Sequence, residues 1–282
     1  MSAEIEAVSA IRPTRAVDSS SRRFQATVGR FQDAASRSTI DELSQWVSEA
    51  FRQDLQKRPS KHVYVRKLPD QAVQLIDRLR DSPIIRAQIM RQFSATSVVV
   101  PMKHTDELYI SHYNKDLGGD QGLFSKHYDG NLRFLSFGSV VRALIYLQSD
   151  ATYKVVFGDS KVEKAFVTYD FGLLDFHREL HWVEGEFAPT DEQRILLKCN
   201  YLIVPENAGK LGQAVEAANT AVFYVVKAAM EYSKSPSHPL QFGVGLICNL
   251  FRLMNNVHPF VPALVILLVL LALGGGIYSL FR

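Results

Sequence analysis

The sequence has 282 residues, of which 47% are hydrophobic and 22% charged, a composition typical of an ordinary globular protein. Its net charge of +3 is too small to indicate a nucleic-acid partner, and the basic residues form no groove-like pattern with aromatic ones. With two cysteines, Cys199 and Cys248, each in an apolar context, the chain has no disulfide framework, which fits a reducing compartment.

The N-terminal stretch 1–30 is rich in Ser and Arg and has no hydrophobic period, so we expect a disordered arm. It contains no apolar stretch of the kind that a secretory signal needs. Beyond it, 31–94 is expected to form a helical part that packs on the outside of a sheet.

Three helices are predicted in this part. Thr39 and Glu42 have the spacing of a capping box, which predicts a helix that begins at Thr39. Apolar residues at helical spacing predict a second helix over Asp70–Leu79. Ser82 followed by Pro83 marks the start of the third, since Pro is favoured at the first helical position.

From Thr96 the pattern changes to short β runs separated by turn residues. Such spacing with few helices predicts a sandwich or jelly roll over 95–206. The expected strands are Ser97–Pro101, Leu108–Tyr113, Leu123–Asp129, Val140–Leu147, Tyr153–Phe157, Ala165–Tyr169, Leu173–Phe176 and Ile195–Val204.

The candidate metal ligands are His127, Asp129 and His181. His127 and Asp129 are two residues apart, so on a strand their side chains lie on the same face. A second His on a neighbouring strand would complete the set, and His181 is the preferred candidate, with His177 as its alternative. Two His and one carboxylate on one side of a metal are the ligands of non-haem Fe(II) oxygenases. The alternative interpretation is that His127 and Asp129 are simply two polar residues at the end of a strand.

An ordered set of features extends this pattern, and it resembles the 2-oxoglutarate- and iron(II)-dependent dioxygenases, most closely their prolyl-4-hydroxylase branch. The resemblance covers about 100 residues, Leu108 to Pro205. The residues that carry it are Tyr113, a Gly-bearing loop, His127-x-Asp129, Arg142-Ala-Leu-Ile-Tyr146-Leu, Gly172-Leu-Leu-x-Phe176, His181 and Arg194.

The resemblance implies a double-stranded β-helix with helices on one sheet. It implies Fe(II) held by His127, Asp129 and His181, with 2-oxoglutarate as cosubstrate and ascorbate as a candidate further cofactor. Arg194 would bind the distal carboxylate of 2-oxoglutarate, because a guanidinium offers two parallel donors. Tyr113 or Tyr146 would give the same carboxylate a hydroxyl.

The sequence departs from the family at two points. Arg194 follows His181 by 13 residues, a longer spacing than usual, which makes Lys198 on the same strand face its rival. The segment Ser149-Asp150-Ala151-Thr152 replaces a Gly-Gly turn. Arg142 pairs with Asp129 or with a substrate carboxylate, or, as we expect first, lies on the surface at a strand end.

The C-terminal part is expected to leave the β core. A helical linker is predicted over 207–259, in which Leu240–Met254 is apolar but too short to span a bilayer. We expect that helix to be interfacial or re-entrant, with a buried helix as the alternative. Val261–Phe281 then gives 21 residues without a charge, enough for a bilayer core of roughly 30 Å. This predicts a single-pass tail anchor over 260–282, with the main domain facing the cytosol.

Two functions remain open at this point. The first is a membrane-tethered Fe(II)/2-oxoglutarate dioxygenase that hydroxylates a protein side chain, for example a prolyl residue, or a lipid. The second is a catalytically inactive scaffold of a membrane assembly. The sequence has no GxSxG, GxxxxGK[ST] or GxGxxG, so hydrolase and nucleotide-binding functions have no motif to support them.

Overall fold

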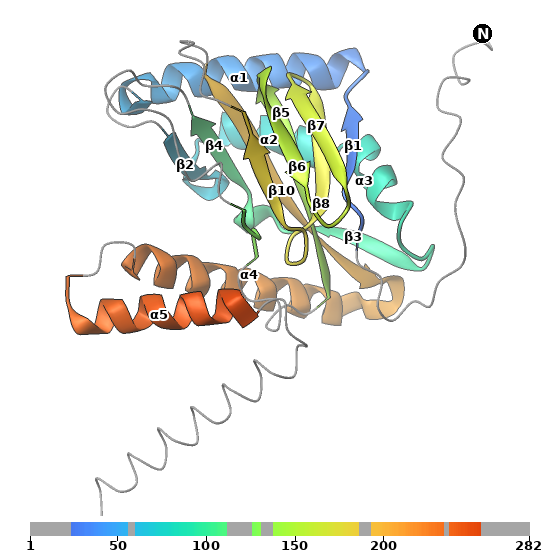
Figure 1. Ribbon diagram of the computed structural model, residues 1–282. Coiled ribbons are helices and arrows are strands. Elements are labelled where there is room, and N and C mark those ends of the chain that lie inside the picture. The colour runs from blue at the N-terminus through green and yellow to red at the C-terminus, as the bar shows by residue number, and fades with distance from the viewer. Residues whose placement is uncertain are drawn as a thin grey trace, which may run out of the picture.

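The computed structural model describes residues 24–55, 60–111, 126–130, 138–185, 193–233 and 237–254. Two antiparallel β-sheets pack face to face, and helices lie outside them (Figure 1). This arrangement confirms the predicted mainly β architecture with flanking helices. The expected anchor Val261–Phe281 and Tyr113 both lie outside the described residues.

The larger sheet has seven strands, all paired antiparallel. Its order is β1 (Thr27–Arg30), β8 (Asp170–Asp175), β5 (Ser139–Gln148), β10 (Arg194–Pro205), β4 (Glu107–Ser111) and β2 (Ser60–Tyr64), and β3 (Ser97–Pro101) pairs with the far end of β10. The smaller sheet has the order β7 (Val162–Val167), β6 (Asp150–Phe157) and β9 (His181–Glu184).

Three helices cover the outer face of the larger sheet: α1 (Ala34–Leu55), α2 (Asp70–Arg80) and α3 (Pro83–Met90). Their apolar stripes, for example Ile40, Leu43 and Val47 of α1, join one buried cluster with alternate residues of β10 such as Leu197 and Tyr201. The burial of such side chains stabilises the fold by roughly 1.5–3 kcal/mol each. The other face of β10 is thereby directed toward the smaller sheet.

The space between the two sheets is filled by a second cluster, which includes Leu144, Tyr146 and Leu196 from the larger sheet and Phe157 and Phe166 from the smaller one. The rings of Tyr146 and Phe166 stack with centroids 4.3 Å apart. This cluster fixes the distance between the sheets and therefore the position of β9, which carries His181.

Two further helices, α4 (Gly209–Ser233) and α5 (Pro239–Met254), lie together at the end of the sheets away from α1 (Figure 1). Phe223 of α4 packs on a third apolar cluster that contains Met102, Val140 and Phe176. Short 3-10 turns η1 (Val65–Lys67), η2 (Lys103–Thr105) and η5 (Glu206–Ala208) connect elements. Within the described part of the chain, no helix combines the length and apolar character needed to cross a bilayer.

Several element boundaries differ from the predictions. Residues 27–30, expected within the disordered arm, form β1 on the edge of the larger sheet, next to β8. The first helix begins at Ala34 instead of Thr39, because the Asp33 carboxylate accepts the Ser36 N–H at 2.7 Å and caps it there. Inside the helix, the Thr39 hydroxyl donates to the Ala35 carbonyl.

Candidate metal centre

The backbones of His127 and His181 pair directly, as a single antiparallel bridge outside the longer strands. Each N–H donates to the other residue's carbonyl at 3.0 Å. Residues directly opposite each other in an antiparallel pair direct their side chains to the same face. The two imidazole rings therefore lie side by side, with centroids 4.4 Å apart.

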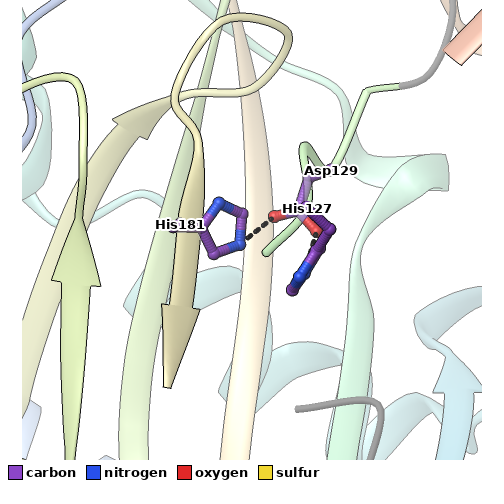
Figure 2. Close-up of side chains that lie close together, drawn as sticks. All are labelled: His127, Asp129 and His181. Carbon is purple, nitrogen blue, oxygen red and sulfur yellow. Dashed lines mark ion pairs between the residues drawn. The ribbon is translucent and has the colours of Figure 1, made fainter. Parts of the chain in front are cut away.

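Asp129 completes the group from two residues beyond His127. Its Oδ2 lies 3.6 Å from His181 Nε2 and its Oδ1 lies 3.9 Å from His127 Nε2. One ligand atom from each of the three residues falls within 4.8 Å of the others. Figure 2 shows the three side chains converging, His181 from β9 and the other two from the 126–130 segment. Donor atoms that share one first-row metal at about 2 Å lie at most about 4 Å apart, and the separations of 3.6 Å and 3.9 Å to Asp129 are within that limit.

His181 is oriented by the turn that precedes β9. Its Nδ1 lies 3.1 Å from the Glu179 carbonyl oxygen, which only accepts, so Nδ1 carries the proton and Nε2 is left as the ligand atom. The Glu179 carboxylate accepts the N–H groups of Asp159 and Ser160 and the Ser160 hydroxyl. This buried carboxylate therefore fixes the turn from which His181 projects.

Arg142 is buried beneath Asp129, which corrects the expectation of a surface arginine at a strand end. Its side chain is 2% exposed and its Nη1 lies 3.0 Å from Asp129 Oδ2. Its Nε donates to Asn200 Oδ1 at 2.9 Å, and Asn200 in turn donates to Thr105. The pairing with Asp129 was one of the alternatives that the sequence left open, and it is confirmed. The support from Asn200 has no local signal, because Asn200 follows Arg142 by 58 residues and meets it through the β5–β10 pairing.

The protonation states of the site suit metal binding. Burial lowers the pKa of His181 to about 4, although Asp129 opposes that shift, so this imidazole is neutral near pH 7. Burial alone would raise the pKa of Asp129, but Arg142 and His181 outweigh it and hold that pKa well below its usual range. A neutral imidazole and an ionised carboxylate are the forms that bind a divalent cation.

His177, the alternative candidate for the second histidine ligand, packs against the backbone of the ligand segment. Its ring packs against Gly130, where a Cβ would approach His177 Nδ1 to 2.2 Å. The Gly130 N–H donates to the Phe176 carbonyl at 2.7 Å, which holds the ligand segment beside the end of β8. The three-residue group that the structure brings together contains His181 and not His177.

The predicted cosubstrate residues Arg194 and Tyr146 also meet. Arg194 is buried at the start of β10, and its Nη2 donates to the Tyr146 hydroxyl at 3.4 Å. Its Nη1 is buried with no hydrogen-bond partner among the described residues. Lys198, the rival, lies 3.2 Å from the Glu107 carboxylate. Of the two cations on this face of β10, Arg194 is the one that retains a buried unpaired donor.

Comparisons with known proteins give structural similarities only; no family model and no curated protein matches the chain. The similar solved structures include the non-heme alpha ketoglutarate dependent epimerase SnoN from nogalamycin biosynthesis, with 15% identity, a TM-score of 0.43 and coverage of 64% of this chain and 78% of that one. HygX from Streptomyces hygroscopicus, with nickel and 2-oxoglutarate bound, has 13% identity, a TM-score of 0.40 and coverage of 63% and 82%. A prolyl hydroxylase from Trichoplax adhaerens has 12% identity, a TM-score of 0.40 and coverage of 63% and 83%.

These similarities concern the fold alone. At TM-scores below 0.5 the similarity adds nothing about function, which rests on the side chains of the site.

Proposed function

We propose that the protein is an Fe(II)- and 2-oxoglutarate-dependent oxygenase built on a double-stranded β-helix. The observation that carries this proposal is the convergence of His127, Asp129 and His181, with His181 neutral and Asp129 ionised near pH 7. Three ligands from one side leave the opposite positions of an octahedral ion open for the cosubstrate and oxygen.

The residues present fit the cosubstrate as well as the metal. A dicarboxylate needs a cation at its far end, and Arg194 offers Nη1, a buried donor without a hydrogen-bond partner in the described part of the chain. An unsatisfied buried donor is costly by about 1–3 kcal/mol unless an acceptor arrives. The Tyr146 hydroxyl, 3.4 Å from Arg194 Nη2, would share the same carboxylate.

When bound, Fe(II) and 2-oxoglutarate would use O2 to oxidise a C–H bond, with one oxygen atom going to the substrate and the other to succinate, and with release of carbon dioxide. The chain's own residues do the positioning. Glu179 fixes the tautomer of His181, and Arg142 holds the second oxygen of Asp129 so that Oδ1 faces His127. Leu196 and Phe166 line the space between the sheets and exclude water from it.

A scaffold without turnover is the second candidate, and the Arg142–Asp129 ion pair is the observation that favours it. Arg142 already neutralises Asp129 without any metal. In a site that has lost its activity, this ion pair would allow the Asp129 carboxylate to stay buried and ionised although no metal binds there.

Succinate release separates the two functions. Full-length protein is supplied with Fe(II), 2-oxoglutarate and oxygen, with His127→Ala as the inactive control and His177→Ala as the matched control. Succinate from wild type and His177→Ala, but not from His127→Ala, supports the oxygenase. Wild-type protein that neither retains Fe(II) nor releases succinate is the result expected of the scaffold.

We also propose that the protein is tethered to a membrane, and that its substrate is a protein side chain or a lipid. The support for the tether is the uncharged segment Val261–Phe281 together with exposed apolar side chains on the helix that precedes it. Those side chains on α5 are Leu240, Phe242, Leu246 and Ile247. Co-flotation of full-length protein with phosphatidylcholine vesicles tests the tether. Protein left at the bottom of the gradient would contradict it.

A further inference from the structure

A cavity that opens to solvent lies between the metal centre and α4. Asp129 and Gly130 form one side of it, and Phe176 and Val140 form another. The cavity therefore reaches the edge of the proposed metal site, where a substrate would have to present its reacting carbon.

One face of α4 makes the opposite wall. The residues involved are Asn219, Val222, Phe223, Val226 and Lys227, which follow the i, i+3, i+4, i+7, i+8 spacing of a single helix face. Val225, between them in sequence, points away from this face and is 69% exposed. The helix thus presents a mainly apolar surface to the cavity, and Lys227 lies at the C-terminal end of that surface.

Two polar residues that line the cavity, Asn200 and Thr105, are already hydrogen-bonded within the protein. Asn200 donates to Thr105 and accepts from Arg142. A peptide would bring backbone N–H and C=O groups into this space, and burying any of them unpaired is unfavourable. An aliphatic chain has no such requirement, and it gains from burial against Val222, Phe223 and Val226.

Lys227 provides a cation at one border of the cavity. Its side chain is 31% exposed, and its Nζ lies 3.9 Å from Glu107 Oε2, beyond hydrogen-bond distance. Glu107 Oε1 is already contacted by Lys198 at 3.2 Å. Lys227 is therefore placed to take a second anion from solvent without leaving the cavity wall.

We propose that this cavity binds the aliphatic chain of an amphipathic substrate, with the chain against the inner face of α4 and an anionic head at Lys227. The proposal rests on the oxygenase function above and narrows its substrate from a protein side chain or lipid to an anionic molecule with an acyl chain. A free fatty acid and an anionic phospholipid share this chemistry.

The test uses full-length protein loaded with Mn²⁺, a paramagnetic ion that broadens nuclear resonances near it. One probe is ¹³C-labelled dodecanoate, and a second is soluble dioctanoyl-phosphatidylglycerol; these two distinguish a free acid from a lipid. We expect chain carbons of at least one probe to broaden. A proline-containing peptide is the third probe, and broadening of the peptide alone would overturn the proposal.

Substitutions on α4 locate the bound chain. Val222→Trp and Val226→Trp fill the cavity and should weaken probe binding at least tenfold, whereas Val225→Trp, on the exposed face, should leave it unchanged. Lys227→Met should weaken the anionic probe but not dodecanol. Equal probe binding by all the Trp variants would overturn the proposal.

Mn²⁺ affinity and succinate release, measured on the same preparations, keep the two claims separate. Wild type that binds Mn²⁺ and releases succinate but binds neither acyl probe removes only the substrate proposal. Wild type that binds no Mn²⁺ removes the oxygenase function itself.

Discussion

Arg142 Nη1 lies 3.0 Å from Asp129 Oδ2, and the two side chains are only 2% and 9% exposed. The guanidinium therefore stands where it neutralises the ligand carboxylate when no metal is bound. It also holds Asp129 so that Oδ1 faces the imidazole of His127, while Oδ2 lies between Arg142 and the imidazole of His181. Metal binding and protein stability are coupled through this pair.

The coupling predicts the behaviour of Arg142→Gln. Loss of the guanidinium leaves Asp129 without its cation, so we expect the free energy of unfolding of the metal-free protein to fall by about 3 kcal/mol. Saturating Mn²⁺ would return a positive charge to Asp129 and should reduce that loss. Urea unfolding with and without Mn²⁺ measures both values.

Arg86→Gln is the matched control, because Arg86 pairs with Asp81 at 2.7 Å on the surface. We expect it to cost at most about 1 kcal/mol, with or without Mn²⁺. An Arg142→Gln loss that is the same in both conditions would show that the pair has no link to the metal site.

The buried carboxylate of Glu107 should make the free energy of unfolding depend on pH in the acid range. Burial alone would raise its pKa, but Lys198, His62 and Lys227 outweigh burial and hold the pKa well below 4.5. The folded-state pKa is thus lower than the unfolded one, so the stabilisation is present above about pH 4.5 and is lost as the pH falls below it.

We therefore expect Glu107→Gln to lower the free energy of unfolding at pH 7 by on the order of 3 kcal/mol, since it removes the charge from a buried cluster. The difference from wild type should shrink toward pH 3.5. Urea unfolding at several pH values gives the comparison. A difference that stays constant with pH would mean that Glu107 is not ionised in the folded protein.

The dependence of succinate release on 2-oxoglutarate concentration tests whether Arg194 or Lys198 binds the cosubstrate. Arg194→Met should raise the half-saturating concentration of 2-oxoglutarate at least about 30-fold, because loss of a buried charged contact costs about 2 kcal/mol or more. Lys198→Met should change it little, since that ammonium contacts Glu107. Fe(II) affinity should be unchanged in both variants. The reverse order of effects would assign the cosubstrate to Lys198.

We expect that only glycine at position 130 allows both full stability and full metal affinity. A Cβ there would meet His177 Nδ1 at 2.2 Å and Phe176 Cδ1 at 2.8 Å, so Gly130→Ala must move either these two rings or the ligand segment. We expect a loss of about 1–3 kcal/mol in stability and weaker metal binding. Gly212→Ala is the control, because its nearest neighbour would lie at 3.4 Å. Unchanged metal affinity in Gly130→Ala would indicate that the segment yields without moving Asp129.

The sequence predicted the strands well because alternation and β-branched runs are local signals. Ser97–Pro101 was predicted with the bounds of β3, and Val140–Leu147 lies within β5. The His-x-Asp spacing likewise indicated that His127 and Asp129 act together, although the described part of the predicted strand Leu123–Asp129 forms only a single bridge at His127. These features depend on neighbours in sequence, so single-sequence patterns are sufficient to find them.

The features that the sequence did not predict depend on contacts between residues that are far apart along the chain. β1 is a short edge strand whose pairing with β8 spans more than 140 residues, and no local pattern marks it. Arg142 resembles a surface residue until β5 and β10 bring Asn200 beside it. The cavity wall on α4 was equally hidden, because an apolar helix face does not reveal which part of the fold it covers.

The most direct test of the account is anaerobic Fe(II) titration by calorimetry of wild type, His181→Ala and His177→Ala. We expect one Fe(II) per chain for wild type and for His177→Ala, and no measurable binding for His181→Ala. Fe(II) binding that survives in His181→Ala but is lost in His177→Ala would contradict the assignment of His127, Asp129 and His181 as the metal ligands.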